Sequence, residues 1–212
     1  MRLRFWIKQG FETVFMILLC SLVYGFFMFV QGNDGWIGLL VLLPLYLLLF
    51  GALLMIAMTT AIHKLAVPLA ISFGSTRNEV LLGLQLYRVI PMFLIPALAT
   101  VLTALGGEQS ALPVSAVFPL GVGAFLLTSA FGSILGVIYV KHGKIATLVA
   151  VISFLTAGFA GGFGAAFSKG FGLSPLSLSG AIPWLVLAAG LFLYAIAMIP
   201  EQRIVWKYNV KL

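Results

Sequence analysis

The stretch His63–Arg88, HKLAVPLAISFGSTRNEVLLGLQLYR, decides how the rest of the sequence is interpreted. It is the longest connection between two segments that are apolar enough to span a membrane. It holds several charged residues, among them Arg77 and Glu79, in a chain of which only 8% is charged. It also holds two apolar runs, 65–71 and 80–82. A connection of this mixed character is expected to lie at the membrane surface, against another protein.

Composition places the chain among integral membrane proteins. It has 212 residues, of which 62% are hydrophobic and 8% charged, whereas a soluble domain has about 25% charged residues. The apolar runs are continuous, which predicts an all-α protein with one transmembrane domain over residues 1–212 rather than a β-barrel of short alternating strands. Because the excess of basic residues lies between spans, the net charge of +7 indicates membrane topology and not nucleic-acid binding.

Six transmembrane helices are predicted. They cover residues 11–30, 36–62, 89–105, 113–140, 145–163 and 181–199. Of the 12 Lys and Arg residues, only Lys169 then falls on the side opposite the termini, so both termini are expected in the cytoplasm of a multi-pass protein of the plasma (inner) membrane. Residues 1–10 predict either a short interfacial helix, with Trp6 at headgroup depth, or a frayed basic terminus.

The central stretch has its own helix signals. Thr76 and Glu79 fit a capping box, in which each of the two side chains binds the backbone N–H of the other residue. A helix from Thr76 would run into the third span, and residues 65–73 would form another short helix with Pro68 in its first turn. Two short helices that meet at Gly74 would make a compact cytoplasmic element. The alternative is a capped loop without any partner.

The run Ser72–Gly83, SFGSTRNEVLLG, resembles the cytoplasmic loop between spans two and three of type-2 ATP-binding-cassette (ABC) permeases, especially small bacterial ones. The six-span layout and the basic ends of the chain fit the same family. The resemblance implies a coupling helix that docks on a separate ATPase subunit, with Arg77 and Glu79 facing it. It implies a second permease subunit, identical or homologous. The partner-binding residues expected on this basis are Phe73, Gly74, Ser75, Thr76, Arg77, Asn78 and Glu79.

The expected function is therefore that of a permease subunit in an exporter of a hydrophobic or amphipathic substrate, such as a peptide, a lipid-like compound or a drug. The chain itself is not expected to be an enzyme or to hold a cofactor. Gly143-Lys144 is followed by Ile145 and lacks the earlier glycine of a phosphate-binding loop. ATP and Mg²⁺ are therefore assigned to the ATPase subunit.

Two further segments are assigned to the transport path with alternatives open. Hydroxyl side chains of the fourth and fifth spans either line the path or bond back to their own helices; they are Thr128, Ser129, Ser133 and Thr156. Residues 164–180 form either re-entrant helices, as the resemblance implies, or a surface loop. Gly132 and Gly136 have the G-x-x-x-G spacing, which predicts close helix packing within the bundle or at a dimer interface.

The positions of the histidines and carboxylates in this sequence do not indicate a metal site or a catalytic site. His63 and His142 stand alone beside lysines at span ends, which favours interfacial anchoring over metal binding. All five acidic residues are placed at or near span ends: Glu12, Asp34, Glu79, Glu108 and Glu201. The absence of a carboxylate inside a span disfavours a transporter driven by protons or sodium, and it disfavours a membrane hydrolase.

Two other classes compete with the exporter. One is the substrate-binding membrane subunit of an energy-coupling-factor importer, which has about the same length and number of spans. The other is a membrane protein without transport function, such as an assembly factor or an immunity protein. Co-purification with an ATPase distinguishes the transporters from the second class.

Overall fold

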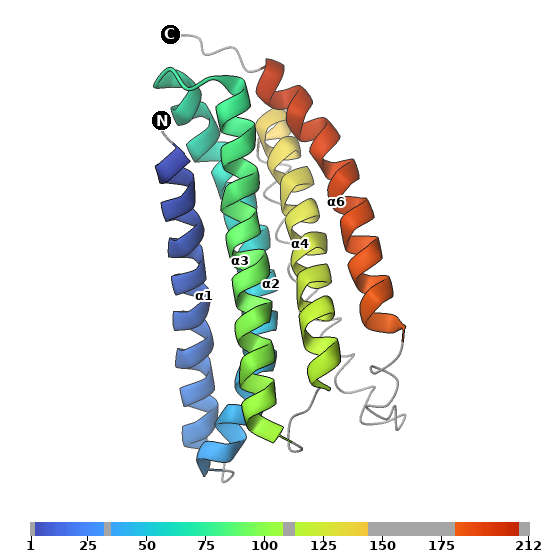
Figure 1. Ribbon diagram of the computed structural model, residues 1–212. Helices are drawn as coiled ribbons and strands as arrows, with labels where there is room; N and C mark the ends of the chain where they lie inside the picture. The colour runs from blue at the N-terminus through green and yellow to red at the C-terminus, as the bar shows by residue number, and fades with distance from the viewer. Residues whose placement is uncertain (1–2, 32–34, 108–112, 144–180, 208–212) are drawn as a thin grey trace.

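The computed structural model describes residues 3–31, 35–107, 113–143 and 181–207 (Figure 1). This part of the chain forms five helices that are long and apolar enough to cross a membrane, and it contains no strand. The helices are α1 (Leu3–Gln31), α2 (Gly35–Ser72), α3 (Arg77–Gly106), α4 (Val114–His142) and α6 (Ile182–Lys207). The predicted all-α membrane class is confirmed. The predicted fifth span and residues 164–180 lie outside the described residues, so the total of six spans stays a prediction.

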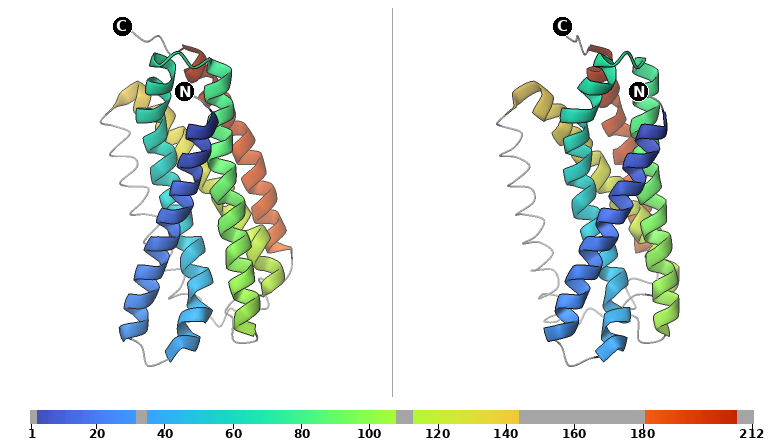
Figure 2. Two further views of the ribbon diagram at one scale, coloured as in Figure 1. Left: turned by 60° about the vertical axis from the view of Figure 1, so that its left-hand side comes forward. Right: turned by 90° about the vertical axis from the view of Figure 1, so that its left-hand side faces the viewer.

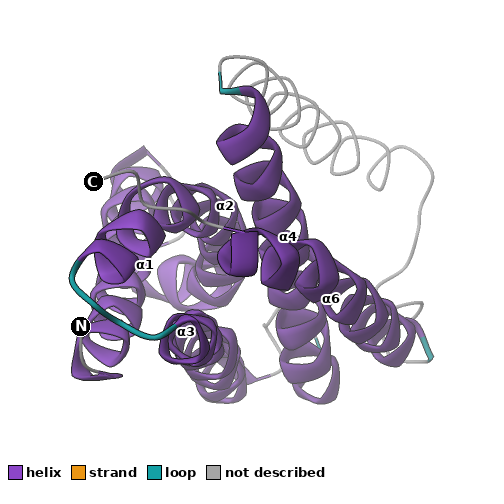
Figure 3. Ribbon diagram, turned by 90° about the horizontal axis from the view of Figure 1, so that it is seen from above, coloured by secondary structure: helices purple, strands orange, loops and turns teal. Residues whose placement is uncertain are grey.

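Helices α1 and α3 run in one direction along the bundle, and α2, α4 and α6 run in the opposite direction. As a result, α1 begins, α2 ends, α3 begins and α6 ends at one end of the molecule (Figures 1 and 2). We call this the turn end, because the turn 73–76 between α2 and α3 lies there. Seen along the bundle, α4 lies between α6 and the group formed by α1, α2 and α3 (Figure 3).

Helix α4 approaches its neighbours closely because it carries glycines. A Cβ added to Gly132 would lie 3.0 Å from the carbonyl oxygen of Ile56 in α2. A Cβ added to Gly123 would lie 2.8 Å from the backbone nitrogen of Leu187 in α6. Helices in a bilayer gain dispersion energy when small residues let their backbones approach. The predicted use of Gly132 within the bundle is confirmed; the pair Gly123 and Gly190, which brings α4 against α6, has no G-x-x-x-G spacing.

Two apolar clusters form the interior. A central cluster joins α1, α2, α3 and α4, and its buried members are Ile17, Leu43, Leu47, Met55, Met92, Ile95, Val122, Phe125 and Leu126. A second one, which we call the turn-end cluster, joins α1, α2, α3 and α6. Its buried members are Trp6, Ile62, Val67, Ala70, Val80, Leu84, Tyr87 and Val205.

The amino-terminal residues belong to the first long helix. Over the described residues 3–10 there is no separate interfacial helix, because α1 runs without a break from Leu3. Trp6 does not lie at the membrane surface: it is only 1% exposed. Its ring occupies the space beside Gly83 of α3, where a Cβ would come within 2.3 Å of it. An aromatic ring that packs against a glycine of the neighbouring helix fixes the start of α1 in the bundle.

The stretch 63–88 is not a loop with two short helices of its own. Helix α2 continues through His63 and Pro68 to Ser72, and α3 begins at Arg77. The prediction of a separate short helix over 65–73 is therefore wrong, whereas the predicted helix that starts at Thr76 and runs into the third span is confirmed. The apolar run 65–71 satisfies its backbone polar groups by extending the helix, and Ile62, Val67 and Ala70 bury it against α1, α3 and α6. A continuous helix also keeps the whole stretch mechanically attached to its span.

Candidate functional site

The connection between α2 and α3 is closed by backbone hydrogen bonds. Gly74 has φ +81, the left-handed conformation that favours glycine. Its N–H donates to the carbonyl of Ile71 at 3.1 Å, and the N–H of Ser75 donates to the carbonyl of Ala70 at 3.0 Å. This is the pattern of a Schellman motif, which ends a helix in a defined direction. The expected change of direction at Gly74 is confirmed.

The first turn of α3 is fixed by the predicted capping box. The Glu79 N–H donates to the Thr76 hydroxyl at 3.3 Å, and the Thr76 N–H donates to the Glu79 carboxylate at 2.9 Å. The turn is thus held from both sides, by the end of α2 and by the start of α3. A force applied to it cannot be absorbed by a flexible loop and passes into both helices.

The residues expected to bind a partner do not all face outward. Phe73 is 71% exposed at the tip of the turn, and Gly74, Thr76 and Asn78 are exposed beside it. Ser75, in contrast, is buried. The Phe73 side chain is the largest apolar group that the turn presents.

Arg77 and Glu79, the two residues assigned to the partner on the basis of charge, have contacts inside the chain. The Arg77 guanidinium carbon lies 5.7 Å from the ring centroid of Trp206 in α6, within the range of a cation–π interaction. Glu79, although exposed, belongs to the capping box. Both side chains therefore stabilise the turn and its contact with α6, whatever they contribute to a partner.

Below the turn, three charged or ionisable side chains meet in the interior. We call His63 of α2, Arg88 of α3 and Glu201 of α6 the buried charge cluster; their side chains are 2%, 0% and 1% exposed. Arg88 donates through both terminal nitrogens to the Glu201 carboxylate, at 2.8 and 2.7 Å. Such a bidentate pair is the strongest form of a charge-assisted hydrogen bond between side chains.

His63 completes the cluster. Its Nε2 lies 3.1 Å from Glu201 Oε1, and its Nδ1 lies 2.7 Å from the backbone oxygen of Thr59. The ring packs on Gly136 of α4, where a Cβ would come within 2.8 Å of it. One carboxylate thus receives a guanidinium and an imidazole, and it ties α6 to both α2 and α3.

The buried charge cluster corrects three expectations from the sequence. The first is that no carboxylate lies inside a span: Glu201 does, so the sequence-based argument against a proton- or sodium-driven transporter and against a membrane hydrolase no longer holds. His63 is not an interfacial anchor, and Glu201 is not part of a tail outside the last span. Helix α6 continues through Pro200, so Glu201 lies inside the helix and in the protein interior. The sequence signal for it is the spacing of Gly190, Ala197 and Glu201, which places these residues on the buried face of α6.

A metal ion does not fit this site. No group of three metal-binding side chains occurs in the part of the chain that the structure describes. Within the cluster only His63 and Glu201 have ligand chemistry, and both oxygens of Glu201 accept hydrogen bonds from Arg88.

The hydroxyls assigned to a substrate path lie on α4 among its helix contacts. Thr128 donates to the carbonyl of Ala124 at 2.9 Å, and Ser133 donates to that of Ser129 at 2.9 Å. Ser129 and Ser133 are buried, and the Ser129 hydroxyl has no hydrogen-bond partner among the residues that the structure describes. Thr128 and Ser133 therefore bond back to their own helix, Ser129 does not, and Thr156 lies outside the described residues.

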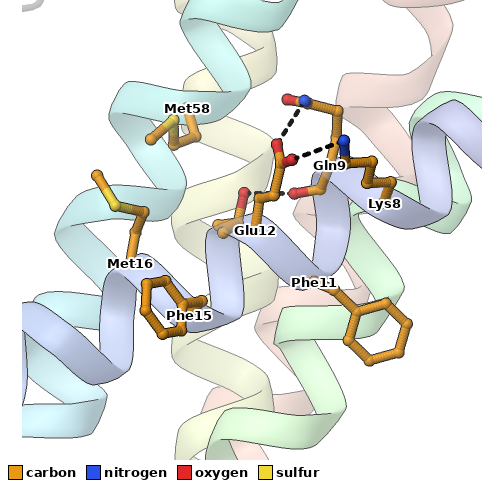
Figure 4. Close-up of a pocket in the computed structure, with 8 residues that line it drawn as sticks. Lys8, Gln9, Phe11, Glu12, Phe15, Met16 and Met58 are labelled. Atoms are coloured by element: carbon orange, nitrogen blue, oxygen red, sulfur yellow. Dashed lines mark hydrogen bonds and ion pairs between the residues drawn. The ribbon is translucent and has the colours of Figure 1, made fainter.

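A surface groove of about 590 Å³ runs along α1 near the turn end (Figure 4). On its polar side, Glu12 accepts a hydrogen bond from Gln9 at 2.7 Å and pairs with Lys8 at 3.6 Å. The remaining wall is mostly apolar and is formed by Phe11, Phe15, Met16 and Met58. The polar groups of the groove are thus paired with one another at its exposed edge.

Searches with the sequence and the structure found no matching protein family, no matching curated protein and no matching solved structure.

Proposed function

We propose that the chain is the membrane permease subunit of an ABC exporter, driven by ATP hydrolysis in a separate ATPase subunit. The observation that carries this proposal is the turn 73–76. It is a four-residue connection, closed by a Schellman motif and a capping box, between two uninterrupted helices. A connection of this kind can transmit a displacement from a bound partner to both helices.

The support behind the turn fits such a role. Val67 and Ala70 of α2 and Val80 and Leu84 of α3 are buried in the turn-end cluster, against Trp6 of α1. The last turns of α2 and the first turns of α3 therefore move together. A displacement of the tip, on binding or closure of an ATPase dimer, tilts both helices as rigid bodies, as coupling between two sites requires.

Phe73 is the residue proposed to enter the ATPase subunit. Exposed aromatic side chains that fill a pocket of a partner supply much of the binding energy of protein interfaces. In this arrangement Arg77 and Glu79 hold the shape of the tip. This revises the sequence-based expectation that their charges make the main contacts.

The remaining parts of the proposal rest on the sequence. The turn end faces the cytoplasm of the plasma membrane, because the basic residues gather on that side. A second permease subunit, identical or homologous, pairs with the chain in the lipid bilayer. The apolar helices and the mostly apolar groove on α1 are in keeping with a hydrophobic or amphipathic substrate.

Phe73 and Leu105 allow a matched test of the coupling role. Their side chains are 71% and 72% exposed, and they lie at opposite ends of the bundle. We expect the tagged chain, purified from its native host in mild detergent, to bring a Walker-motif ATPase with it. Phe73→Ala should reduce the recovered ATPase at least tenfold, and Leu105→Ala should leave it unchanged.

Two results would contradict the proposal. If no ATPase is recovered with the unchanged protein, even after cross-linking in the membrane, the chain belongs to the class without transport function. If ATPase is recovered equally with both variants, the turn is not the docking element, and an importer subunit that docks through helix faces becomes the better explanation.

A further inference from the structure

His63 occupies a position in which both ring nitrogens face hydrogen-bond acceptors. Nδ1 lies 2.7 Å from the carbonyl oxygen of Thr59, and Nε2 lies 3.1 Å from Glu201 Oε1. A backbone carbonyl oxygen cannot donate, so Nδ1 must carry a hydrogen. A neutral imidazole has only one N–H. If Nδ1 holds it, the Nε2 lone pair points at the carboxylate.

The carboxylate cannot relieve this conflict while it is ionised. Both of its oxygens already accept hydrogen bonds from Arg88, at 2.8 and 2.7 Å. An ionised carboxylate is acceptor-only, and two facing lone pairs at 3.1 Å repel each other at a site where both side chains are buried. A hydrogen must therefore lie between Nε2 and Oε1.

We infer that His63 and Glu201 form a buried proton-binding site, in which one proton is shared between His63 Nε2 and Glu201 Oε1. The proton is additional to the positive charge of Arg88. Whether it is drawn on the imidazole or on the carboxyl group, the buried charge cluster carries one more positive charge than the Arg88–Glu201 pair alone. This inference does not depend on the proposed transport function.

Within the described part of the chain, Glu201 is the titratable group within hydrogen-bond distance of the His63 ring. Among the described residues, the groups that face His63 are the Thr59 carbonyl of α2, Glu201 of α6 and, through Glu201, Arg88 of α3. From α4 the ring meets Gly136, which has no side chain. The charge of Arg88 is held by Glu201 and not by the ring.

The site also links proton binding to helix contact. Its two halves belong to α2 and α6, which are far apart in sequence. The shared proton therefore bridges α2 and α6 where the two helices pack. Carboxylates buried inside a transmembrane bundle often belong to proton relays.

Nitrogen NMR of His63 tests the inference directly. The sequence has two histidines, so the variant His142→Gln, labelled with ¹⁵N-histidine and purified in detergent at pH 7.5, reports on one ring. We expect both ring nitrogens to resonate at the position of protonated nitrogen. The alternative supporting result has two parts: Nε2 resonates as unprotonated nitrogen, and an infrared band of a protonated carboxyl group is present that disappears in Glu201→Gln. This result would place the shared proton on Glu201 Oε1. A bare Nε2 with an ionised Glu201 would overturn the inference.

A second variant keeps the test informative if Glu201→Gln alone does not fold. Arg88→Met combined with Glu201→Gln removes both charges, so no unpaired charge remains buried. In this background the Gln amide can donate to Nε2, and the Nε2 resonance should shift to the position of a bare nitrogen. If Nε2 stays protonated there, the proton does not depend on Glu201, and the shared site is refuted.

Discussion

Glu201 is expected to contribute more to stability than Arg88, although the two form one ion pair. Glu201 accepts hydrogen bonds from Arg88 and lies within hydrogen-bond distance of His63, whereas Arg88 has Glu201 as its charge partner. Replacing Glu201 by Gln leaves the Arg88 guanidinium buried without a negative charge. Replacing Arg88 by Met leaves Glu201 in contact with His63. The two substitutions therefore differ in what remains uncompensated.

The magnitudes follow from this difference. Breaking a buried ion pair so that one charge stays behind costs about 3–5 kcal/mol, and this is the expected loss for Glu201→Gln. A retained hydrogen bond to a charged group is worth about 1.5–3 kcal/mol. Since Arg88→Met keeps the contact between His63 and Glu201, its expected loss is about 1–3 kcal/mol. The double variant leaves no charge of the pair behind and should cost clearly less than the sum of the two single losses.

The free energy of unfolding can be measured in mixed micelles of a mild detergent and sodium dodecyl sulfate, with circular dichroism as the signal. All four proteins of the cycle should be measured under the same conditions, and Leu105→Ala serves as a control for a substitution at an exposed position. If the two single losses are equal and the double loss equals their sum, Arg88 and Glu201 do not interact as the structure describes, and the reasoning is refuted.

Three smaller perturbations test the elements around the cluster with the same unfolding assay. Gly83→Ala places a methyl group against the Trp6 ring and should cost about 1–3 kcal/mol; combining it with Trp6→Leu should recover part of the loss, and two additive losses would contradict the close contact. Thr76→Ala removes one bond of the capping box and should cost about 1 kcal/mol, whereas Thr76→Ser should cost much less; equal losses would show that the hydroxyl is not used. Gly123→Ala forces α4 away from Leu187 of α6 and should lower the rate at which two cysteines, one engineered into each of these helices, form a disulfide. An unchanged rate would refute the backbone contact.

The ends of the helices show which features were predictable from the sequence. The Gly74 turn and the capping box of Thr76 and Glu79 follow from local chemistry, because a left-handed residue and a reciprocal pair of side-chain bonds need only their neighbours in sequence. The structure contains both. Local signals of this kind do not reveal whether a helix on either side is short or continues for many turns.

The charged residues show what was not predictable. In the sequence alone, charges such as Lys64 and Arg88 indicate a loop outside the membrane, since a charge inside a span is costly. Arg88 nevertheless lies in the buried face of α3, four residues after Leu84, because Glu201 of α6 neutralises it there. The two residues are 113 positions apart, so no local pattern connects them. Pro200 makes Glu201 still harder to recognise as a residue inside the last span, because a proline after an apolar run usually indicates the end of a helix.

The position of the buried charge cluster connects the two proposals physically. Arg88 follows Arg77 by 11 residues in one helix, so at about 1.5 Å per residue it lies roughly 16 Å along α3 from the turn. Over this distance α3 is a stiff rod, and Arg88 holds its far part to α6 through two hydrogen bonds. A tilt of α3 that starts at Phe73 must therefore either carry α6 along or break the contact with Glu201.

If the tilt carries α6, the cross-link between α4 and α6 should change when an ATPase binds, and the proton on His63 should stay. If it breaks the contact, ATPase binding should change the nitrogen resonances of His63. Measuring both signals in one ATPase-bound sample decides between a rigid joint and a proton-linked one.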